Sequence, residues 1–562
     1  MPAPAPANAP APARHRRVRV PVLDEATTHL LHLPSPRSEY KLTRGLAIPA
    51  RDGVMLAADL YQPARTPRGT LLVRGPYGRG LPFSMLSARI FAVYGYNVLF
   101  VSCRGTFGSS GEFDPARTEA ADGQDVVAWL IRQSWFTGSF ATLGPSYLGY
   151  TQWALLADPP PELATAIITV GPHDFSRHTW GTGAFNLDIL GWGDMIAHQE
   201  DGGTLSGMLR RRGAARRLRP VLDDLPLADA ADKFLEGRAP WYRERVTRPD
   251  LTDPFWAPMQ HGVALDIATI PVLLQSGWQD LFLSQTIEQY TRLHERGVEV
   301  ALTVGPWTHI EVISKGASVL TKESLDWLDA HLADMAGPRQ RSQVRVFVTG
   351  AGAKAGAWRD LDAWPPPTVP QVWYPQPGGG LAQEVPPADA APSTFTFDPA
   401  QPTPTVGGPL LERGGIVDDS SLARRDDVLT FTSAALDAPL EVMGAPVAEL
   451  AHHSDNPHAD LFVRLSEVDA RRRSRNVTEG YVRLDPGRDD APVRLELRPT
   501  AHRFEAGSRL RLYIAGGSHP QFARNLGTDE NPGTGTGLRP ATHSIAHAGQ
   551  TTSSLTLPSS PT

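Results

Sequence analysis

The chain has 562 residues, enough for about two to four domains at roughly 150 residues each. Hydrophobic residues make up 41% and charged residues 20%, and the 51 glycines and 52 prolines together stay below the roughly 25–30% of low-complexity chains, so the composition is that of a globular protein. The formal charge of −6 argues against the basic surface of a nucleic-acid binder. The single cysteine, Cys103, excludes a disulfide framework within the chain and a cysteine-rich zinc site.

The first 39 residues differ in composition from the rest of the chain. A Pro/Ala tract leads into a basic cluster, MPAPAPANAPAPARHRRVRV, so we expect residues 1–39 to form a disordered tail. The tract has no apolar core of the roughly 7–15 residues that a secretory signal contains. Because no run reaches the roughly 18 apolar residues of a membrane span, we expect a cytoplasmic protein with no membrane partner.

Residues 40–173 alternate short apolar runs with helical patterns. This alternation predicts a largely parallel sheet with helices on both faces. Strand patterns return after residue 266, so residues 40–173 and 267–350 are expected to be two parts of one α/β domain. The expected strands are 70–74, 97–103, 140–143, 270–276 and 298–304, and the expected helices are 120–133 and 147–157.

A polar, helical segment interrupts the α/β pattern at residues 174–266. We expect it to form a helical cap that is inserted over the sheet. It carries a run of arginines, which we interpret as a solvated helix face rather than an anion site. These residues are Arg210, Arg211, Arg212, Arg216, Arg217 and Arg219.

The chain changes character again after a Pro-rich stretch, and we assign residues 351–368 to a linker. Beyond the linker, helical periodicity almost disappears and apolar residues alternate with polar ones. One apolar face per strand is typical of antiparallel sheets that pack face to face, so residues 369–562 are predicted to form a β-sandwich or jelly roll. The clearest alternating residues are Val493, Leu495, Leu497, Leu510, Leu512 and Ile514.

The sequence around Ser146 has the form of a nucleophile elbow, in which an apolar strand meets Gly-x-Ser and then a helix. The turn is too tight for a side chain two positions before the serine, and Gly144 fits there. A second small residue usually lies two positions after the serine, but that position is Leu148 and the glycine is Gly149. Taken alone, this Gly-x-Ser also fits an ordinary turn and helix cap.

Two later residues could activate Ser146. A serine hydroxyl attacks poorly near neutral pH unless a base takes its proton and a carboxylate holds the base. Asp280 follows the expected strand 270–276 and His309 follows the expected strand 298–304, in the chain order typical of α/β-hydrolases. Individually, Asp280 also fits a helix N-cap and His309 an ordinary loop histidine. Together with Ser146 they predict a catalytic triad.

The developing oxyanion of acyl transfer needs hydrogen-bond donors. The backbone N–H of Tyr147 is one candidate, because it lies at the start of a helix whose dipole favours negative charge. The glycine-rich loop after the expected strand 70–74 offers a second candidate, the phenol of Tyr77. Tyr77 fits equally well as a ring that packs on this turn.

Four motifs, together with their order, resemble the cocaine-esterase-type serine hydrolases. This family is grouped with X-Pro dipeptidyl-peptidases, α-amino-acid ester hydrolases and cephalosporin acylases. The motifs are Arg-x-Pro-Tyr at 74–77, Gly-x-Ser-Tyr-x-Gly at 144–149, Gly-Trp-x-Asp-x-Phe at 277–282 and Gly-Pro-Trp-x-His at 305–309. The position of Gly149 is that family's own form. One departure is Ser102, where the family commonly has Asp or Asn.

The resemblance covers nearly the whole chain after about residue 40. It implies an α/β-hydrolase domain, an inserted helical cap and a C-terminal jelly roll. It also implies a set of roles, with Ser146 as nucleophile, His309 as base, Asp280 as the orienting carboxylate, Tyr77 and the Tyr147 amide as oxyanion hole, and Trp180, Trp192 and Phe282 as acyl-pocket aromatics.

The expected function is hydrolysis of carboxylic esters through an acyl-enzyme, with amides as a further substrate class. An X-Pro dipeptidyl-peptidase or an α-amino-acid ester hydrolase or acylase is the alternative within the family. From another class, the β-rich C-terminal domain could act as a carbohydrate- or protein-binding module. We expect no cofactor and no metal site, a small-molecule ester or amide as the partner, and no nucleic acid. Exposed cap helices and a jelly-roll face would allow a homodimer, although the oligomeric state stays open.

Overall fold

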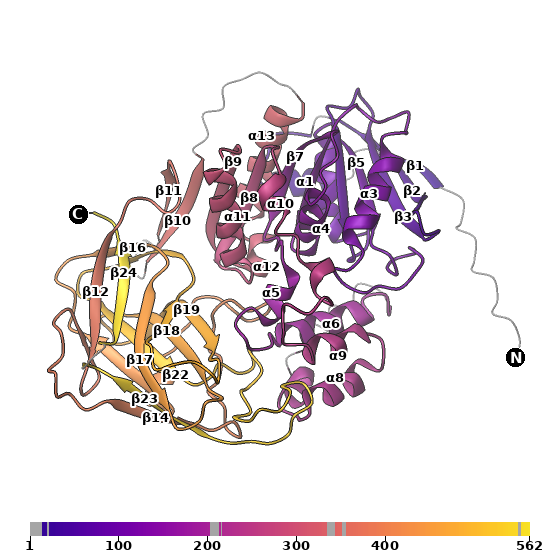
Figure 1. The fold of residues 1–562 in the computed structure, drawn as a ribbon. Coiled ribbons are helices and arrows are strands. Elements are labelled where there is room, and N and C mark those ends of the chain that lie inside the picture. The colour runs from indigo at the N-terminus through magenta and orange to yellow at the C-terminus, as the bar shows by residue number, and fades with distance from the viewer. Residues whose placement is uncertain are drawn as a thin grey trace, which may run out of the picture.

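The computed structural model describes residues 14–18, 22–36, 38–202, 213–214, 216–333, 343–350, 356–548 and 552–561. Its first half is built on one twisted sheet (Figure 1). The sheet is parallel from β5 to β10 and antiparallel at both flanks. In spatial order its described strands are β1 (Arg14–Val18), β2 (Tyr40–Pro49), β3 (Met55–Pro63), β5 (Asn97–Ser102), β4 (Thr70–Gly75), β6 (Phe140–Pro145), β7 (Leu163–Thr169), β8 (Val272–Gln279), β9 (Val300–Thr308), β10 (Val344–Gly350) and β11 (Ala357–Leu361).

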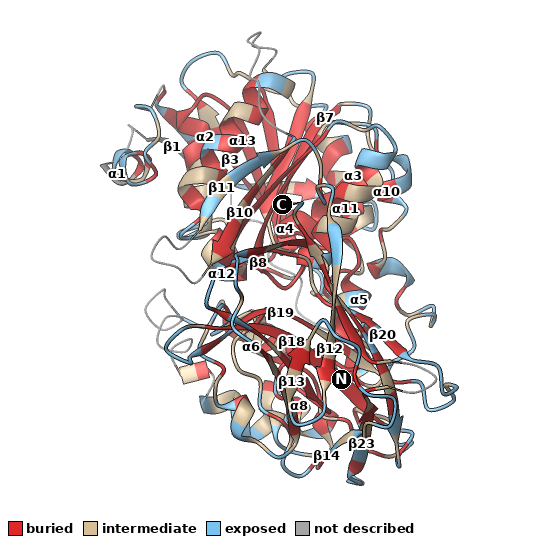
Figure 2. Cartoon of the chain, turned by 90° about the vertical axis from the view of Figure 1, so that its left-hand side faces the viewer, coloured by how far each residue is buried: buried red, intermediate tan, exposed pale blue. Residues whose placement is uncertain are grey.

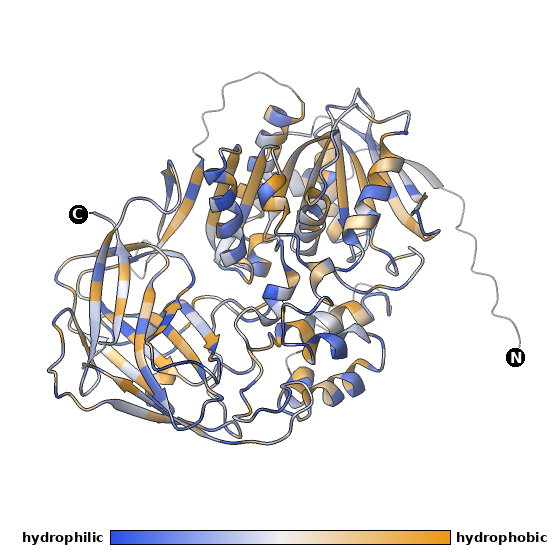
Figure 3. Ribbon diagram, viewed as in Figure 1, coloured by the Kyte–Doolittle hydropathy of each residue, from blue (hydrophilic) through white to orange (hydrophobic). Residues whose placement is uncertain are grey.

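Helices cover both faces of this sheet, so its central strands are buried on both sides (Figure 2). Leu71 and Leu72 are neighbours on β4 but belong to separate hydrophobic cores, because successive side chains of a strand point to opposite faces. The strands are accordingly apolar along their length while the helices present polar outer faces (Figure 3). The helices are η1 (Met85–Arg89), α2 (Ile90–Val93) and α13 (Ala317–His331) on one face, and α3 (Glu119–Leu130), α4 (Tyr147–Leu156) and α11 (Leu283–Glu295) on the other.

The α/β fold class that the sequence predicts is confirmed. Every strand and helix expected in the two α/β segments is present as β4, β5, β6, β8, β9, α3 or α4, with ends that differ by a few residues. Strands with continuous apolar runs are easy to recognise because a doubly covered parallel sheet requires them.

The prediction of a disordered tail over residues 1–39 is wrong for its second half. β1 pairs with β2, and α1 (Val22–Leu30) follows it. The carboxylate of Asp24 is buried, and it accepts hydrogen bonds from the Tyr40 hydroxyl (3.1 Å) and the Arg89 guanidinium (3.2 Å). These contacts anchor α1 to the domain. Residues 1–13 lie outside the described residues.

The expected cap lies between β7 and β8 and contains α5 (Phe175–Trp180), α6 (Asp188–His198), α8 (Leu227–Leu235), α9 (Trp241–Val246) and η2 (Ala257–Met259). The last helix of this segment, α10 (Ala264–Ile267), packs into the core of the α/β domain, so the cap ends earlier than residue 266. Of the arginine run, Arg210, Arg211 and Arg212 lie outside the described residues. Arg216 and Arg219 are exposed, whereas Arg217 pairs with Asp194 at 2.7 Å.

The C-terminal region is a β-sandwich, as predicted. Its alternating residues enclose a separate core, and Val493 and Leu495 are buried while Arg494 and Glu496 are exposed. One sheet has the order β13 (Gly380–Ala382), β15 (Val428–Ser433), β22 (Arg509–Ala515), β18 (Asp460–Val468) and β19 (Ser474–Arg483). The facing strands are β12 (Val369–Gln376), β14 (Ser393–Phe397), β16 (Leu440–Gly444), β17 (Val447–Ser454), β20 (Val493–Glu496), β21 (Thr500–Phe504), β23 (Ala541–Ala546) and β24 (Ser554–Ser559), and η3 spans Leu422–Arg424.

The two halves are joined by more than a linker. β10 pairs with β9 of the central sheet and, at its end, with β21 of the sandwich. Residues 351–355 lie outside the described residues, but β11 falls within the predicted linker at 351–368 and pairs with β10, so that prediction is wrong for β11. Among the described helices, none has the length and apolarity to cross a membrane.

Candidate active site

Ser146 occupies the sharp turn between β6 and α4. Its backbone angles, φ 59° and ψ −122°, are strained for a residue other than glycine, and such strain is the mark of a nucleophile elbow. Gly144 has φ 154°, and a Cβ there would lie 2.4 Å from the Cβ of Leu148. Glycine is therefore required at 144, as the sequence predicts.

The displaced second glycine of the elbow has a packing explanation. Gly149 of α4 touches Gly171, which follows β7, and a Cβ added to either would lie 2.7 Å from the Cα of the other. Leu148, at the position usually taken by a small residue, fills the space beside Gly75 at the end of β4, where a Cβ would lie 2.3 Å from Leu148 Cδ1. Gly75 on β4 thus accommodates Leu148, and Gly171 after β7 lets α4 approach at Gly149.

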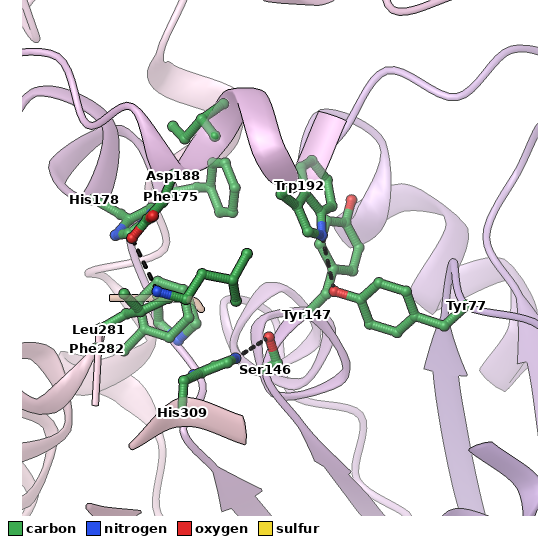
Figure 4. Close-up of a pocket in the computed structure, with 13 residues that line it drawn as sticks. Tyr77, Ser146, Tyr147, Phe175, His178, Asp188, Trp192, Leu281, Phe282 and His309 are labelled. Atoms are coloured by element: carbon green, nitrogen blue, oxygen red, sulfur yellow. Dashed lines mark hydrogen bonds between the residues drawn. The ribbon is translucent and has the colours of Figure 1, made fainter. Parts of the chain in front are cut away.

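The side chains of Ser146, His309 and Asp280 form one hydrogen-bonded chain. Figure 4 shows the bond between Ser146 and His309. His309 Nε2 lies 2.9 Å from Ser146 Oγ, and His309 Nδ1 lies 2.6 Å from Asp280 Oδ1. Asp280 is fully buried and His309 is 5% exposed. With its Nδ1–H donated to the carboxylate, the imidazole presents the Nε2 lone pair to the serine hydroxyl.

Local hydrogen bonds hold both partners of the serine in place. The second oxygen of Asp280, Oδ2, accepts the Phe282 N–H at 3.0 Å and the Ser276 hydroxyl at 3.2 Å. His309 begins α12 (His309–Val312), whose start is fixed by a capping box between Thr308 and Glu311. The rotations of the carboxylate and the imidazole are therefore both restricted.

Two donors face the region of Ser146. The Tyr147 amide is in the first turn of α4, where N–H groups have no partner within the helix. Tyr77 Oη accepts a hydrogen bond from the indole N–H of Trp192 at 3.1 Å, and this bond holds the phenol at the edge of the pocket. Figure 4 shows the Tyr77 hydroxyl directed toward the side of the pocket where Ser146 lies.

A buried network fixes the side chain of Tyr147. Its hydroxyl donates to Glu119 Oε1 (2.9 Å) and accepts the Ala116 N–H (2.6 Å), and Arg74 pairs with Glu119 Oε2 at 2.8 Å. Burial raises the pKa of the Glu119 carboxyl, whereas the Arg74 charge opposes this rise. Burial, and secondly the nearby Glu119, raise the pKa of the Tyr147 phenol. Glu119 was not identified from the sequence, since nothing in the spacing of α3 marks it.

The triad opens into a pocket with a mostly apolar wall. The cap supplies Phe175, His178, Ile189 and Trp192, and the C-terminal domain supplies one residue, Leu411. The full lining is Tyr77, Ser146, Tyr147, Pro172, Phe175, His178, Asp188, Ile189, Trp192, Leu281, Phe282, His309 and Leu411.

A carboxyl group and a second imidazole, those of Asp188 and His178, interrupt this apolar wall. Asp188, at the start of α6, accepts the Leu411 N–H at 3.1 Å, and burial raises the pKa of its carboxyl to about 7. Burial, and secondly the nearby charges of Arg498 and His309, lower the pKa of His178 to about 3, so His178 is neutral near pH 7. The His178 ring lies edge-on to Phe282 with centroids 4.7 Å apart and acts as part of the aromatic wall.

Comparison with known proteins agrees with this geometry. A family model described as X-Pro dipeptidyl-peptidase (S15 family) matches residues 52–311, and a second, its C-terminal non-catalytic domain, matches residues 337–556. The cocaine esterase of Rhodococcus sp. (strain MB1 Bresler) is 28% identical over 550 residues, covering 87% of this chain and 93% of that protein. The predicted resemblance to the cocaine-esterase-type serine hydrolases is confirmed.

Solved structures of similar proteins carry the same fold. An α-amino acid ester hydrolase superposes with a TM-score of 0.80 at 22% identity, covering 93% of this chain and 97% of that chain. An aminopeptidase from a marine sediment archaeon, Thaumarchaeota archaeon, gives a TM-score of 0.76 at 23% identity, covering 92% and 96%. The three-part architecture of this serine hydrolase, with its α/β domain, cap and β-sandwich, is therefore shared along nearly the full chain.

Not every site residue that the family resemblance implied lies at the pocket of this serine hydrolase. Trp192 and Phe282 line the pocket, but Trp180 does not. The Trp180 side chain is buried inside the cap, where its indole donates to the Arg245 carbonyl at 2.8 Å and its ring packs on Phe185. Trp180 therefore stabilises the cap, and its prediction as a pocket residue is wrong.

The remaining pocket residues could not be identified from the sequence. Phe175, Asp188 and Ile189 come from cap helices whose orientation no spacing determines, and Leu411 comes from a loop of the other domain. In the part of the chain that the structure describes, no group of three or more His, Cys, Asp or Glu side chains is arranged to bind a metal ion.

Proposed function

We propose that the protein hydrolyses carboxylic esters of small molecules through an acyl-enzyme on Ser146. The observation that carries the proposal is the chain of hydrogen bonds from Ser146 through His309 to Asp280, beside a largely apolar pocket. The names of the similar proteins, a cocaine esterase and an α-amino acid ester hydrolase, support esters as the substrate class.

In the acylation step, His309 Nε2 takes the proton of Ser146 as Oγ attacks the ester carbonyl carbon. The π electrons of the carbonyl move to its oxygen, and the Tyr147 N–H and the Tyr77 hydroxyl stabilise the resulting oxyanion. When the intermediate collapses, the bond to the alcohol oxygen breaks and the proton on Nε2 passes to the leaving alcohol. A water molecule then repeats the sequence on the acyl-enzyme and releases the acid.

The test is a panel of p-nitrophenyl esters assayed with the parent enzyme and with Ser146→Ala. We expect kcat to fall by roughly five orders of magnitude or more. A fluorophosphonate should add one adduct mass to the parent and none to Ser146→Ala, which reports the nucleophile without the need for a natural substrate. A Ser146→Ala protein that turns over an activated ester at the parent rate would exclude this function.

A second candidate, cleavage of substrates that carry a free ammonium group, is favoured by Asp188. Recognition of an α-ammonium needs a carboxylate in the pocket, and Asp188 provides one among apolar neighbours. An X-Pro dipeptidyl-peptidase or an α-amino-acid ester hydrolase would use such a group. The discriminating experiment compares Ala-Pro-p-nitroanilide and amino-acid esters with neutral acyl esters of the same size. Preference for the charged substrates that disappears in Asp188→Asn would reverse the order of the two candidates.

We also propose that the protein is cytoplasmic. A chain with a single cysteine forms no internal disulfide, so its folding does not require an oxidising compartment. Fractionation of the producing cells, with the ester assay as the readout, tests it.

A further inference from the structure

The C-terminal domain contacts the segment that carries the catalytic carboxylate. Arg498, between β20 and β21, donates from Nη1 to the Asp280 carbonyl at 2.7 Å and from Nη2 to the Leu281 carbonyl at 3.1 Å. On the preceding residue, the Gln279 side chain donates to the Val477 carbonyl at 3.0 Å. Three consecutive residues around the carboxylate are therefore bonded to a domain whose family description calls it non-catalytic.

Arg498 is itself held firmly within its own domain. Its backbone N–H donates to the Glu479 carbonyl at 3.0 Å, and its backbone carbonyl accepts the Thr478 hydroxyl at 2.6 Å. Both partners belong to β19, a long strand in the middle of the chain's C-terminal half. The guanidinium is thus fixed relative to the β-sandwich.

The side chain of Arg498 does not behave as an ordinary ion-pair partner. Within the described residues its guanidinium makes no salt bridge, and its side-chain hydrogen bonds go to two neighbouring carbonyls. Burial lowers the pKa of this guanidinium, while the charges of Glu479, Asp280 and Asp188 oppose the effect. Partial burial of a cation costs desolvation free energy, so we looked for a role of Arg498 that offsets this cost.

The turn that Arg498 holds carries two parts of the active site. Asp280 binds His309 through Oδ1, and its Oδ2 accepts the Phe282 N–H within the same turn. Leu281 and Phe282 form part of the pocket wall. A shift of the turn would therefore move the carboxylate away from the imidazole, and a displacement of about 1 Å can lower a rate by roughly a hundredfold.

We propose that Arg498 is a positioning residue for acyl transfer, through which the C-terminal domain holds the Asp280–Phe282 turn in the geometry that His309 requires. The proposal rests on the function proposed above. Among the described residues, Arg498 forms no hydrogen bond or ion pair with a triad side chain and does not line the pocket, and it acts through two backbone carbonyls. A planar guanidinium can donate to both carbonyls at once, which an ammonium cannot do with the same geometry.

A matched control exists on the same interface. Arg524 is also an arginine of the C-terminal domain, burial also lowers the pKa of its guanidinium, and it donates to the Asp223 carbonyl of the cap (2.9 Å) and to the Pro399 carbonyl (3.1 Å). It lies outside the lining of the catalytic pocket. If Arg498 only joins the domains, its removal should resemble removal of Arg524.

The experiment compares the full-length variants Arg498→Lys, Arg498→Met and Arg524→Met, with a p-nitrophenyl ester as substrate. We expect kcat per folded enzyme to fall roughly tenfold in Arg498→Lys and roughly a hundredfold in Arg498→Met, with a smaller change in KM. Arg524→Met should keep kcat within about twofold of the parent. Thermal unfolding, measured in parallel, gives the folded fraction of each variant.

A second readout does not depend on turnover. The proton shared by His309 Nδ1 and Asp280 should give a far-downfield resonance in a one-dimensional proton spectrum, and this resonance should shift or broaden in Arg498→Met but not in Arg524→Met. An unchanged resonance in Arg498→Met, or losses of kcat that are equal in Arg498→Met and Arg524→Met, would overturn the proposal. Because the resonance is measured without substrate, failure of the ester panel would count against the proposed function alone.

Discussion

The two sides of the triad are held in different ways. The nucleophile side is local, because the geometry of Ser146 follows from the elbow and from glycines that let α4 approach β4 and the segment after β7. The base side is assembled from distant parts of the chain, with His309 on the capping box of α12 and the Asp280 turn bonded to the C-terminal domain. Steric exclusion shapes one side, whereas hydrogen bonds shape the other.

This difference predicts different responses to mutation. Substitutions on the nucleophile side should act mainly through strain and overpacking, and so should change stability together with activity. Substitutions on the base side should remove orienting hydrogen bonds and so should lower kcat in a protein that remains folded.

The largest effect expected on the base side comes from Asp280→Asn. The substitution preserves the shape of the side chain but removes its charge. Because the Phe282 N–H requires an acceptor at Oδ2, the new amide NH2 would face His309 Nδ1 and favour the tautomer that cannot take the serine proton. We expect kcat to fall by about 10⁴-fold, as measured with an activated ester. Thermal unfolding of the same preparation shows whether the fold survives. A loss of less than tenfold in a folded variant would mean that the carboxylate does not orient the base.

A smaller effect is expected for Tyr77→Phe, which sharpens the assignment of the oxyanion donors. The ring should keep its stacking on Phe83, at a centroid distance of 5.2 Å, but the phenolic proton is removed. We expect kcat to fall by roughly 10²–10³-fold with little change in KM, since the oxyanion forms only during the reaction. Steady-state kinetics measure both constants. A kcat equal to that of the parent would show that the Tyr77 hydroxyl is not an oxyanion donor.

The nucleophile side can be broken without touching the triad, by Gly75→Ala. The added Cβ would lie 2.3 Å from Leu148 Cδ1 inside a packed core, so we expect a loss of about 1–3 kcal/mol in the free energy of unfolding. The double variant Gly75→Ala, Leu148→Ala relieves this clash. In a double-mutant cycle, its loss of stability should therefore be smaller than the sum of the losses in the two single variants. Denaturant unfolding measures both, and purely additive losses would argue against the packing explanation of the elbow.

The sequence predicted the parts of this molecule that obey local rules. The strands before Ser146, Asp280 and His309 are continuous apolar runs, and a parallel sheet brings their carboxyl ends to one edge, so the order of the three residues was enough to group them. The alternation at Val493 and Leu495 identified the β-sandwich for a similar reason, because a single buried face imposes a period of two.

Tertiary contacts decided what the sequence did not predict. Trp180 and Trp192 are both aromatic residues of the cap, but the packing of its helices sends one into the cap core and the other to the pocket. Composition predicted disorder around residue 24, yet the bonds from Tyr40 and Arg89 to Asp24 fix that segment. Arg498 showed no local pattern, since its role depends only on what lies across the domain interface.

The smallest expected effect concerns Asp188, which lies where the cap meets the C-terminal domain. The pKa of its carboxyl is raised from 3.8 to about 7, chiefly by burial, so between these values the folded protein binds one proton more than the unfolded chain. The free energy of unfolding should therefore contain a contribution that is complete below about pH 4 and is lost as the pH rises through about 7. Asp188→Asn removes this contribution, so its stability relative to the parent should increase across the window by about 1–2 kcal/mol, after allowance for partial exposure. Urea unfolding at pH 5 and pH 8 measures the difference.

The variant Asp158→Asn, at an exposed carboxylate, serves as the control. Equal pH dependence in both variants would show that Asp188 ionises as freely as a surface carboxylate. That result would also weaken the case for Asp188 as the group that selects an ammonium-bearing substrate.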